Sequence, residues 1–237
     1  MIRHWVLGLA LLGCVPAQAA ELRLVSTSLP PLVNETAGQQ SGVAVEVIQA
    51  MAKAANRKLD IAMLPWARAQ KMAMDGSDIG IFPLERTAAR EQSYRWVVQL
   101  LKNPVVAVAK AGSPLASIDE CKGEVVGFKT NSPGAAIATE RGFGQTDPVT
   151  EEVQNARKLL AGRIGCWIAG KLLAEQALRD AGADFSAVKQ VAILTEGNMY
   201  LAASKSIDDA EAKVWQNAFT AIKSDGTYDR IMGKYAE

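Results

Sequence analysis

The chain has 237 residues, of which 49% are hydrophobic and 22% are charged. The 26 lysine and arginine residues nearly balance the 25 aspartate and glutamate residues, and the net charge is +1. This balance creates no extended positive field, which argues against binding to nucleic acid or to an acidic membrane surface. The length suits one large domain or two of about 100–120 residues.

The first twenty residues have the features of a secretory signal peptide. A basic start at 3–4 is followed by an apolar run at 5–13 and by a small-x-small cleavage site at 17–19. We expect a signal peptide at 1–20 and a mature protein in the periplasm. The alternative is a lipoprotein that carries its lipid on Cys14.

Histidine is absent from the predicted mature chain, because the single histidine, His4, lies within the signal peptide. This absence excludes Ser-His-Asp and Cys-His nucleophile systems, imidazole general bases and nearly all zinc sites. We therefore expect neither a metal nor a cofactor.

Two cysteines remain in the mature chain, Cys121 and Cys166. Their separation fits neither a metal-binding spacing nor a CxxC redox motif. In an exported protein the spacing favours a structural disulfide. Two buried free thiols are the alternative, since cysteine is often a core residue.

Strands and helices alternate in the first part of the mature chain. Apolar residues at helical spacing from 43 to 55 predict a helix that ends near Asn56. The order of elements predicts parallel strands with helices packed on the faces of the sheet. The predicted elements are a strand at 22–26, a helix after Gly42, a strand at 59–64, a helix at 66–74 and a strand at 79–82.

A second alternation follows and predicts a second lobe of the same kind. The strands are expected at 105–109, 124–128, 148–149, 164–169, 188–195 and 199–203, and the helices from 133, at 151–161, 171–181 and 208–224, and from 228. The fold class is therefore α/β, with two doubly wound α/β lobes joined by two hinge strands. Short crossing segments near 101–104 and 196–199 would form the hinge. They divide the chain into lobe 1, residues 21–102 plus 199–237, and lobe 2, residues 103–198.

Several motifs occur in a characteristic order along essentially the whole mature chain. They include Leu22-Arg23-Leu24-Val25, Pro30-Pro31, Thr87-Ala88-Ala89-Arg90, Gly162-Arg163-Ile164 and Asp225-Gly226-Thr227-Tyr228. Together they resemble the bacterial extracellular solute-binding proteins of family 3, amino-acid-binding-like proteins with the type II periplasmic binding fold. The resemblance implies a monomer whose two lobes close over a small molecule and deliver it to a membrane permease of the ABC type or to a receptor.

The resemblance also assigns a role to Arg90, the arginine of the Thr-x-x-Arg turn, which in this family grips the carboxylate of the ligand. A guanidinium group pairs with a planar carboxylate through two parallel hydrogen bonds. We expect Thr87 to cap the short helix that orients Arg90. The alternative is a surface arginine in an ion pair, a role that suits Arg86 and Arg95 better.

In lobe 2 the resemblance points to the loop at 129–133, whose hydroxyl and amide groups face the same carboxylate in relatives. We expect Asn131 and Ser132 to bind the ligand. The loop leads into a helix, and a helix N-terminus offers free N–H groups and a positive dipole end to an anion. As an alternative, Ser132 is a plain N-cap with Pro133 at the first helical position.

The sequence departs from the amino-acid-binding relatives at two glycines. Gly165 and Gly170 stand where those proteins carry two aspartates, the second of which binds the ammonium group of the ligand. This departure argues against an ordinary α-amino acid as the ligand. Glu85 is a candidate to replace the lost negative charge, and the alternative is an ion pair of Glu85 with Arg86 or Lys71.

Two tryptophans are candidates for the wall of the ligand pocket. Trp66 begins a helix beside the predicted cleft, and Trp167 lies in the strand that ends at Gly170. An aromatic ring can stack on a ligand or attract a cation. Ordinary core packing is the alternative for each of them.

The sequence thus predicts a periplasmic receptor, not an enzyme, for a small polar solute that bears a carboxylate. One alternative is a dehydratase-like enzyme on the same scaffold, with Glu85 as general acid and Arg90 holding the substrate. Another is a subunit that senses a ligand for a membrane receptor.

Overall fold

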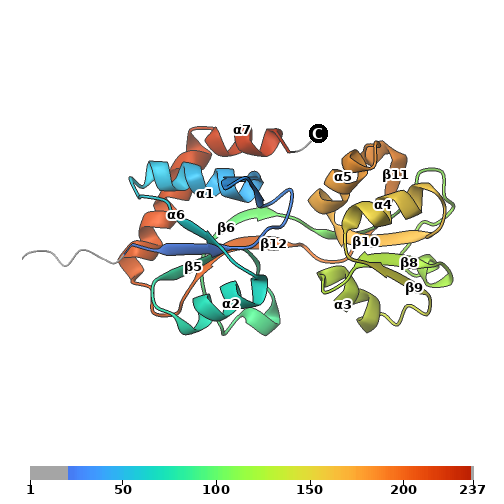
Figure 1. Ribbon diagram of the computed structural model, residues 1–237, viewed down its shortest axis with the longest axis horizontal. Helices are drawn as coiled ribbons and strands as arrows, with labels where there is room; N and C mark the ends of the chain where they lie inside the picture. Colours follow the sequence, from blue (N-terminus) through green and yellow to red (C-terminus); the bar gives the residue numbers. More distant parts are fainter. Residues whose placement is uncertain (1–20, 236–237) are drawn as a thin grey trace, which may run out of the picture.

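The computed structural model describes residues 21–235. Two five-stranded sheets lie side by side, each with helices on its faces, and two stretches of chain run between them (Figure 1). The predicted signal peptide and the alternative lipidation site at Cys14 lie outside the described residues. Within the described part, no helix is long and apolar enough to cross a membrane.

The first sheet has the strand order β4-β1-β5-β12-β6. Its strands are β4 (Ile61–Met63), β1 (Arg23–Ser26), β5 (Ile79–Glu85), β12 (Asn198–Ala203) and β6 (Arg95–Lys102). β1 runs parallel to β4 and β5, whereas β12 runs antiparallel to β5 and β6. One face carries α1 (Val43–Ala54), α6 (Asp209–Ser224) and α7 (Thr227–Gly233), and the other carries α2 (Trp66–Asp75) (Figure 1).

The second sheet has the strand order β11-β7-β10-β8-β9. Its strands are β11 (Val188–Ile193), β7 (Val105–Lys110), β10 (Cys166–Gly170), β8 (Val126–Lys129) and β9 (Thr146–Val149). β8 runs parallel to β9 and β10, whereas β7 runs antiparallel to β10 and β11. Its helices are α3 (Pro133–Glu140) on one face and α4 (Glu152–Leu160) and α5 (Lys171–Asp180) on the other.

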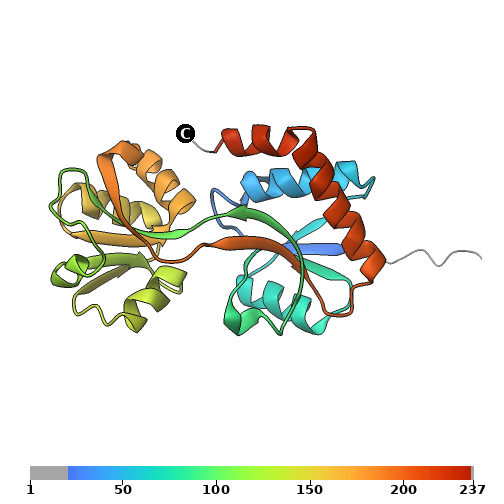
Figure 2. The ribbon, with the colours of Figure 1, turned by 180° about the vertical axis from the view of Figure 1, so that it is seen from behind.

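The predicted alternation of strands and helices is confirmed, and β1, β4 and β5 run parallel as predicted. Each sheet is nevertheless mixed, because it also contains strands that connect the two lobes. The chain leaves the first sheet after β6 and enters the second with β7, then returns from β11 to β12 (Figure 2). Because the outgoing and returning strands lie next to each other, they run antiparallel. Neither β6 nor the hairpin of β2 (Asn34–Thr36) and β3 (Gln39–Ser41) was predicted.

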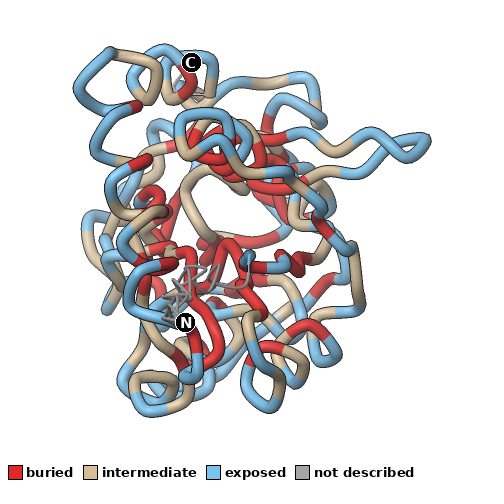
Figure 3. The backbone as a smooth tube through the Cα atoms, turned by 90° about the vertical axis from the view of Figure 1, so that its left-hand side faces the viewer, coloured by how far each residue is buried: buried red, intermediate tan, exposed pale blue. Residues whose placement is uncertain are grey.

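The buried apolar residues form separate clusters on the faces of the two sheets. In α1, the predicted face with Val43, Val47, Ile48 and Met51 is fully buried. It packs with α6, whose Trp215 is 2% exposed. Figure 3, in which the two lobes lie one behind the other, shows buried stretches towards the middle and exposed loops around the outside. Each lobe therefore has a core of its own.

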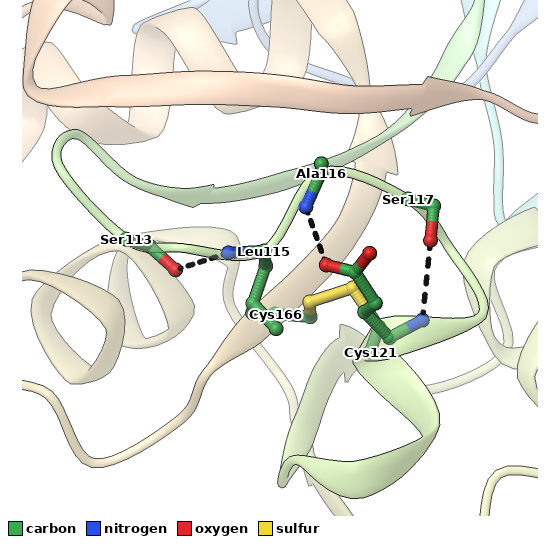
Figure 4. Close-up of a disulfide and its surroundings, with 7 residues drawn as sticks. Ser113, Leu115, Ala116, Ser117, Cys121 and Cys166 are labelled. Atoms are coloured by element: carbon green, nitrogen blue, oxygen red, sulfur yellow. Dashed lines mark hydrogen bonds between the residues drawn. A yellow bond between two sulfur atoms is a disulfide. The ribbon is translucent and has the colours of Figure 1, made fainter.

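A disulfide joins Cys121 to Cys166 within the second lobe (Figure 4). Cys121 lies in the short 3-10 helix η2 (Glu120–Gly123), and Cys166 is the first residue of β10. Both are fully buried, and their Cα atoms are 5.8 Å apart. The predicted disulfide is confirmed. It ties the segment before β8 to the strand that ends at Gly170.

Candidate ligand-binding site

In the first lobe, the parallel strands β1, β4 and β5 end at the same edge of the sheet. The hydroxyl of Ser26, the last residue of β1, donates to the carbonyl oxygen of Phe82 at 2.6 Å. The backbone N–H of Leu64, just after β4, donates to the carbonyl oxygen of Ser26 at 2.9 Å. In open α/β sheets, ligands bind outside the carboxyl ends of the strands. This edge is therefore the lobe's candidate binding face.

Glu85 is the last residue of β5, and its carboxylate is half-buried. Its Oε1 atom lies 3.5 Å from Thr195 Oγ1, which belongs to the segment that returns from β11 to β12. Burial raises the pKa of Glu85, and the positive charge of Arg90 and the Thr195 hydroxyl partly offset this effect. Glu85 thus joins the edge of the first sheet to the returning segment.

Arg86 and Lys71, the two alternative ion-pair partners of Glu85, pair with other carboxylates. Arg86 pairs with Glu91, and its guanidinium lies 5.4 Å from the ring centres of both Trp96 and Tyr200. Lys71 pairs with Asp75. The alternative in which Glu85 pairs with Arg86 or Lys71 is therefore wrong.

Arg90 closes the short 3-10 helix η1 (Ala88–Arg90), and its side chain folds back onto the end of β5. Its Nη1 donates to the backbone carbonyl oxygen of Glu85 at 3.1 Å. Within residues 21–235 the Arg90 guanidinium forms no ion pair, whereas Arg95 pairs with Asp209. Thr87 makes no side-chain cap, so the predicted cap is wrong. The other N–H groups of Arg90 remain free to meet an anion.

Trp66 is the first residue of α2 and follows Pro65. Its ring is partly buried against the apolar cluster beneath α2, which includes Val25, Ala69 and Leu84. Because Trp66 is only partly buried, it still has surface to offer a ligand.

In the second lobe, β8 leads through Thr130–Ser132 into α3. The Ser132 hydroxyl accepts from the N–H of Ala135 at 3.2 Å and donates to the carbonyl oxygen of Lys129 at 2.6 Å. Ser132 is therefore an N-cap, with Pro133 at the first helical position. Asn131 is exposed, and its side chain makes no hydrogen bond to any residue that the structure describes. Asn131 is thus the freer of the two predicted ligand contacts.

Trp167 lies in the core of the second lobe and not at its edge. Its side chain is fully buried beneath α4 and α5, and its Nε1 donates to Glu152 Oε2 at 2.9 Å. Burial raises the pKa of Glu152, while hydrogen bonds from Asn155 and Trp167 counteract part of the rise. Of the two alternatives for Trp167, core packing is the one seen, and the ring offers no surface to a ligand.

The two segments between the sheets are joined to each other, a feature that the sequence analysis did not identify. The backbone N–H of Asn103 donates to the carbonyl oxygen of Gly197 at 2.8 Å. A Cβ atom at residue 197 would lie 1.8 Å from the carbonyl oxygen of Asn103, and Gly197 has a φ of +57°. Glycine is required at this close contact. The glycine at residue 197 is the signal in the sequence that could have marked it.

The structure thus brings Arg90 and Glu85 together at one edge of the first sheet. Trp66 lies at the same edge, while Asn131 and Ser132 lie at the carboxyl edge of the second sheet. A surface pocket of the first lobe contains none of these five residues and is lined by Arg23, Arg68, Lys71, Met72, Asp75, Gly76, Ser77 and Ile79. Among residues 21–235, no group of histidine, cysteine, aspartate and glutamate side chains could hold a metal ion.

Solved structures of bacterial binding domains resemble the whole described chain. The second substrate-binding domain of an amino acid ABC transporter from Streptococcus pneumoniae is 19% identical, with a TM-score of 0.70 over 91% of this chain and 100% of that one. Substrate-binding domain 2 of GlnP from Lactococcus lactis, in an open conformation, is 17% identical, with a TM-score of 0.70 over 91% and 95%. A histidine kinase sensor domain similar to periplasmic binding proteins is 17% identical, with a TM-score of 0.73 over 91% and 96%.

At these identities the likeness establishes the fold, the type II periplasmic binding fold that the sequence predicted. No curated protein matches the sequence. The model of the bacterial extracellular solute-binding proteins, family 3, matches residues 24–237. These proteins bind solutes and are not enzymes, which argues against the dehydratase alternative. The chain belongs to the bacterial extracellular solute-binding proteins of family 3.

Proposed function

We propose that the protein is a periplasmic receptor that captures a small carboxylate-bearing solute between its two lobes and delivers it to a membrane transporter of the ABC type. The observation that carries the proposal is the guanidinium of Arg90. It is held by the Glu85 carbonyl oxygen at 3.1 Å and has no ion pair among the described residues. An arginine oriented in this way is suited to bind a carboxylate through two hydrogen bonds.

The lobes of the receptor would be residues 21–102 plus 199–237 and residues 103–198. This division is supported by the sheets, because β1, β4, β5, β6 and β12 form one sheet and β7 to β11 form the other. Two short connections at 103–104 and 194–197 favour rotation of one lobe against the other. A solute stabilises the closed state only if it binds that state more tightly than the open one, so it has to contact both lobes.

The polar groups at the two edges define the chemistry of the solute. Arg90 would bind its carboxylate, and the half-buried Glu85 would bind a positive or hydrogen-donating group nearby. From the second lobe, the exposed amide of Asn131 and the N-terminus of α3, capped by Ser132, would approach the same carboxylate. The exposed part of the Trp66 ring would cover an apolar part of the solute.

The periplasm is the compartment that best fits the molecule. The buried disulfide between Cys121 and Cys166 supports an oxidising environment. The description of the family as extracellular supports export in the same way. Delivery to a permease is the role we favour over reporting to a membrane sensor. Capture of the ABC permease, and not of a sensor kinase, by the solute-loaded protein in membrane extracts would test that preference.

The binding function is tested by thermal shift against a library of small polar metabolites. Five reference carboxylates, L-arginine, L-glutamine, L-glutamate, succinate and 2-oxoglutarate, are then measured by titration calorimetry. We expect at least one carboxylate to raise the melting temperature in a concentration-dependent way. Small-angle scattering should show a smaller radius of gyration with that solute. The absence of any stabilising carboxylate would overturn the proposal.

A further inference from the structure

Asn103 holds the two connecting segments and the start of α5 together. It is 3% exposed. Its backbone N–H donates to Gly197 on the returning segment, and its side-chain Oδ1 accepts from the N–H of Leu172 at 3.0 Å. Because Leu172 N–H needs an acceptor, this contact fixes which end of the amide faces α5. The Nδ2 group is therefore the end of the amide that does not meet Leu172 N–H.

The Nδ2 group of Asn103 has no hydrogen-bond partner among residues 21–235. Unlike Tyr94 Oη and Trp96 Nε1, which are fully buried and also lack a partner, this nitrogen is not fully buried. The N–H groups of an otherwise buried residue thus remain accessible. Water accepts from this donor in the free protein, and an acceptor atom of a bound solute can replace that water.

Gly170 is the residue that makes room for this amide. A Cβ atom at residue 170 would lie 2.6 Å from Asn103 Nδ2. Gly170 is also the N-cap of α5 and provides no side-chain cap of its own. Asn103 supplies the missing cap from the connecting segment, and in return its Nδ2 takes the position that a side chain at residue 170 would occupy.

The contact with Gly170 places Asn103 Nδ2 at the end of β10. Gly170 ends β10 on the same face as Ile168, and the start of α3 packs there, since a Cβ atom at Gly134 would lie 2.7 Å from the Ile168 carbonyl oxygen. Thr195 Oγ1 accepts from the N–H of Val105 at 3.4 Å and reaches Glu85 of the first lobe. Because β10 runs parallel to β8, whose carboxyl end leads to Asn131 and Ser132, the amide beside Gly170 lies at the same edge of the second sheet as these two residues.

We infer that Asn103 is a specificity-determining ligand contact whose Nδ2 donates a hydrogen bond to an acceptor oxygen of the bound solute. The oxygen belongs to a carboxylate, a carbonyl or a hydroxyl group, because an ammonium group would meet the positive end of the amide dipole. The inference rests on the proposed function. It adds that the Asn103 amide, which lies where a side chain at residue 170 would be, favours solutes with a hydrogen-bond acceptor at that position.

The test replaces Asn103 by Asp, which keeps an acceptor for Leu172 N–H, removes the donor and adds a negative charge. Affinities of the five reference carboxylates are measured by calorimetry for the wild type and for Asn103→Asp. For each one that binds the wild type, we expect the variant to lose at least about tenfold in affinity, because a donor is replaced by a negative charge. A cooperative thermal transition without solute shows that the variant is folded.

Asn56→Asp, at the end of α1, introduces the same charge change away from the connecting segments and should leave every affinity unchanged. Asn103→Ala is the second variant should Asn103→Asp fail to fold, and it should weaken binding about five- to tenfold. Wild-type affinity in either folded Asn103 variant would overturn the inference alone. Failure of every reference carboxylate to bind the wild type would overturn the proposed function and this inference with it.

Discussion

The guanidinium of Arg90 lies against the end of β5, where its Nη1 donates to the carbonyl oxygen of Glu85 at 3.1 Å. This single bond orients a cation next to a half-buried carboxylate without neutralising it, since the bond is made to the backbone of Glu85 and not to its side chain. The site therefore presents a positive and a negative group side by side at one sheet edge.

Replacing Arg90 by Ala should weaken binding of a carboxylate about 10- to 100-fold, the effect of losing a charge-assisted pair of hydrogen bonds. Calorimetry with the solute that binds the wild type measures this loss. Arg95→Ala is the matched control, because Arg95 pairs with the exposed Asp209 in the same lobe. Equal affinities for Arg90→Ala and Arg95→Ala would show that Arg90 does not hold the solute.

Glu85→Gln should stabilise the protein without solute at pH 7. Burial raises the pKa of Glu85 above its ordinary value of 4.5, so its stabilising contribution is complete below that value and is lost as the pH rises through the folded-state pKa. The ionised carboxylate therefore costs stability at pH 7, and glutamine removes that cost. Thermal melts between pH 4 and 8 should show a gain for the variant that shrinks towards acid pH. A gain that is constant with pH would contradict the assignment.

Trp167→Phe should destabilise the second lobe by about 1–3 kcal/mol, because the buried Glu152 carboxylate loses a hydrogen-bond donor. Urea unfolding measures the change. Solute affinity should not change, since Trp167 is fully buried. Trp66→Ala is the comparison, and we expect it to lower affinity. Weaker binding in a stably folded Trp167→Phe protein would mean that the ring reaches the solute.

Replacing both cysteines, Cys121→Ser with Cys166→Ser, should lower the free energy of unfolding by about 2–5 kcal/mol, because the disulfide closes a long loop in the unfolded chain. The sequence separation of the two cysteines is 45 residues. Denaturant unfolding of the variant, and of the wild type with and without reductant, measures this. The same stability in all three samples would show that the bond contributes nothing.

Local patterns in the sequence were sufficient for most helices. The apolar face of α1 and the Ser132-Pro133 start of α3 follow from residue spacing and capping chemistry, which act over a single turn. Local patterns do not predict β6, because Arg95–Lys102 is half-buried at a sheet edge and has no strict alternation of buried and exposed residues. They also predict a cap from Thr87 that the structure lacks.

The sequence by itself determined that the chain alternates strands and helices in two successive series, carries a family-typical Arg90 and keeps two cysteines, Cys121 and Cys166, whose disulfide it favoured. These features depend on local spacing or on residue type. Only the tertiary structure decided which way Trp167 faces, that Glu85 meets Thr195, and that Asn103 fills the space beside Gly170. Each of these contacts joins residues far apart in the chain, and their meeting depends on how the two sheets are connected.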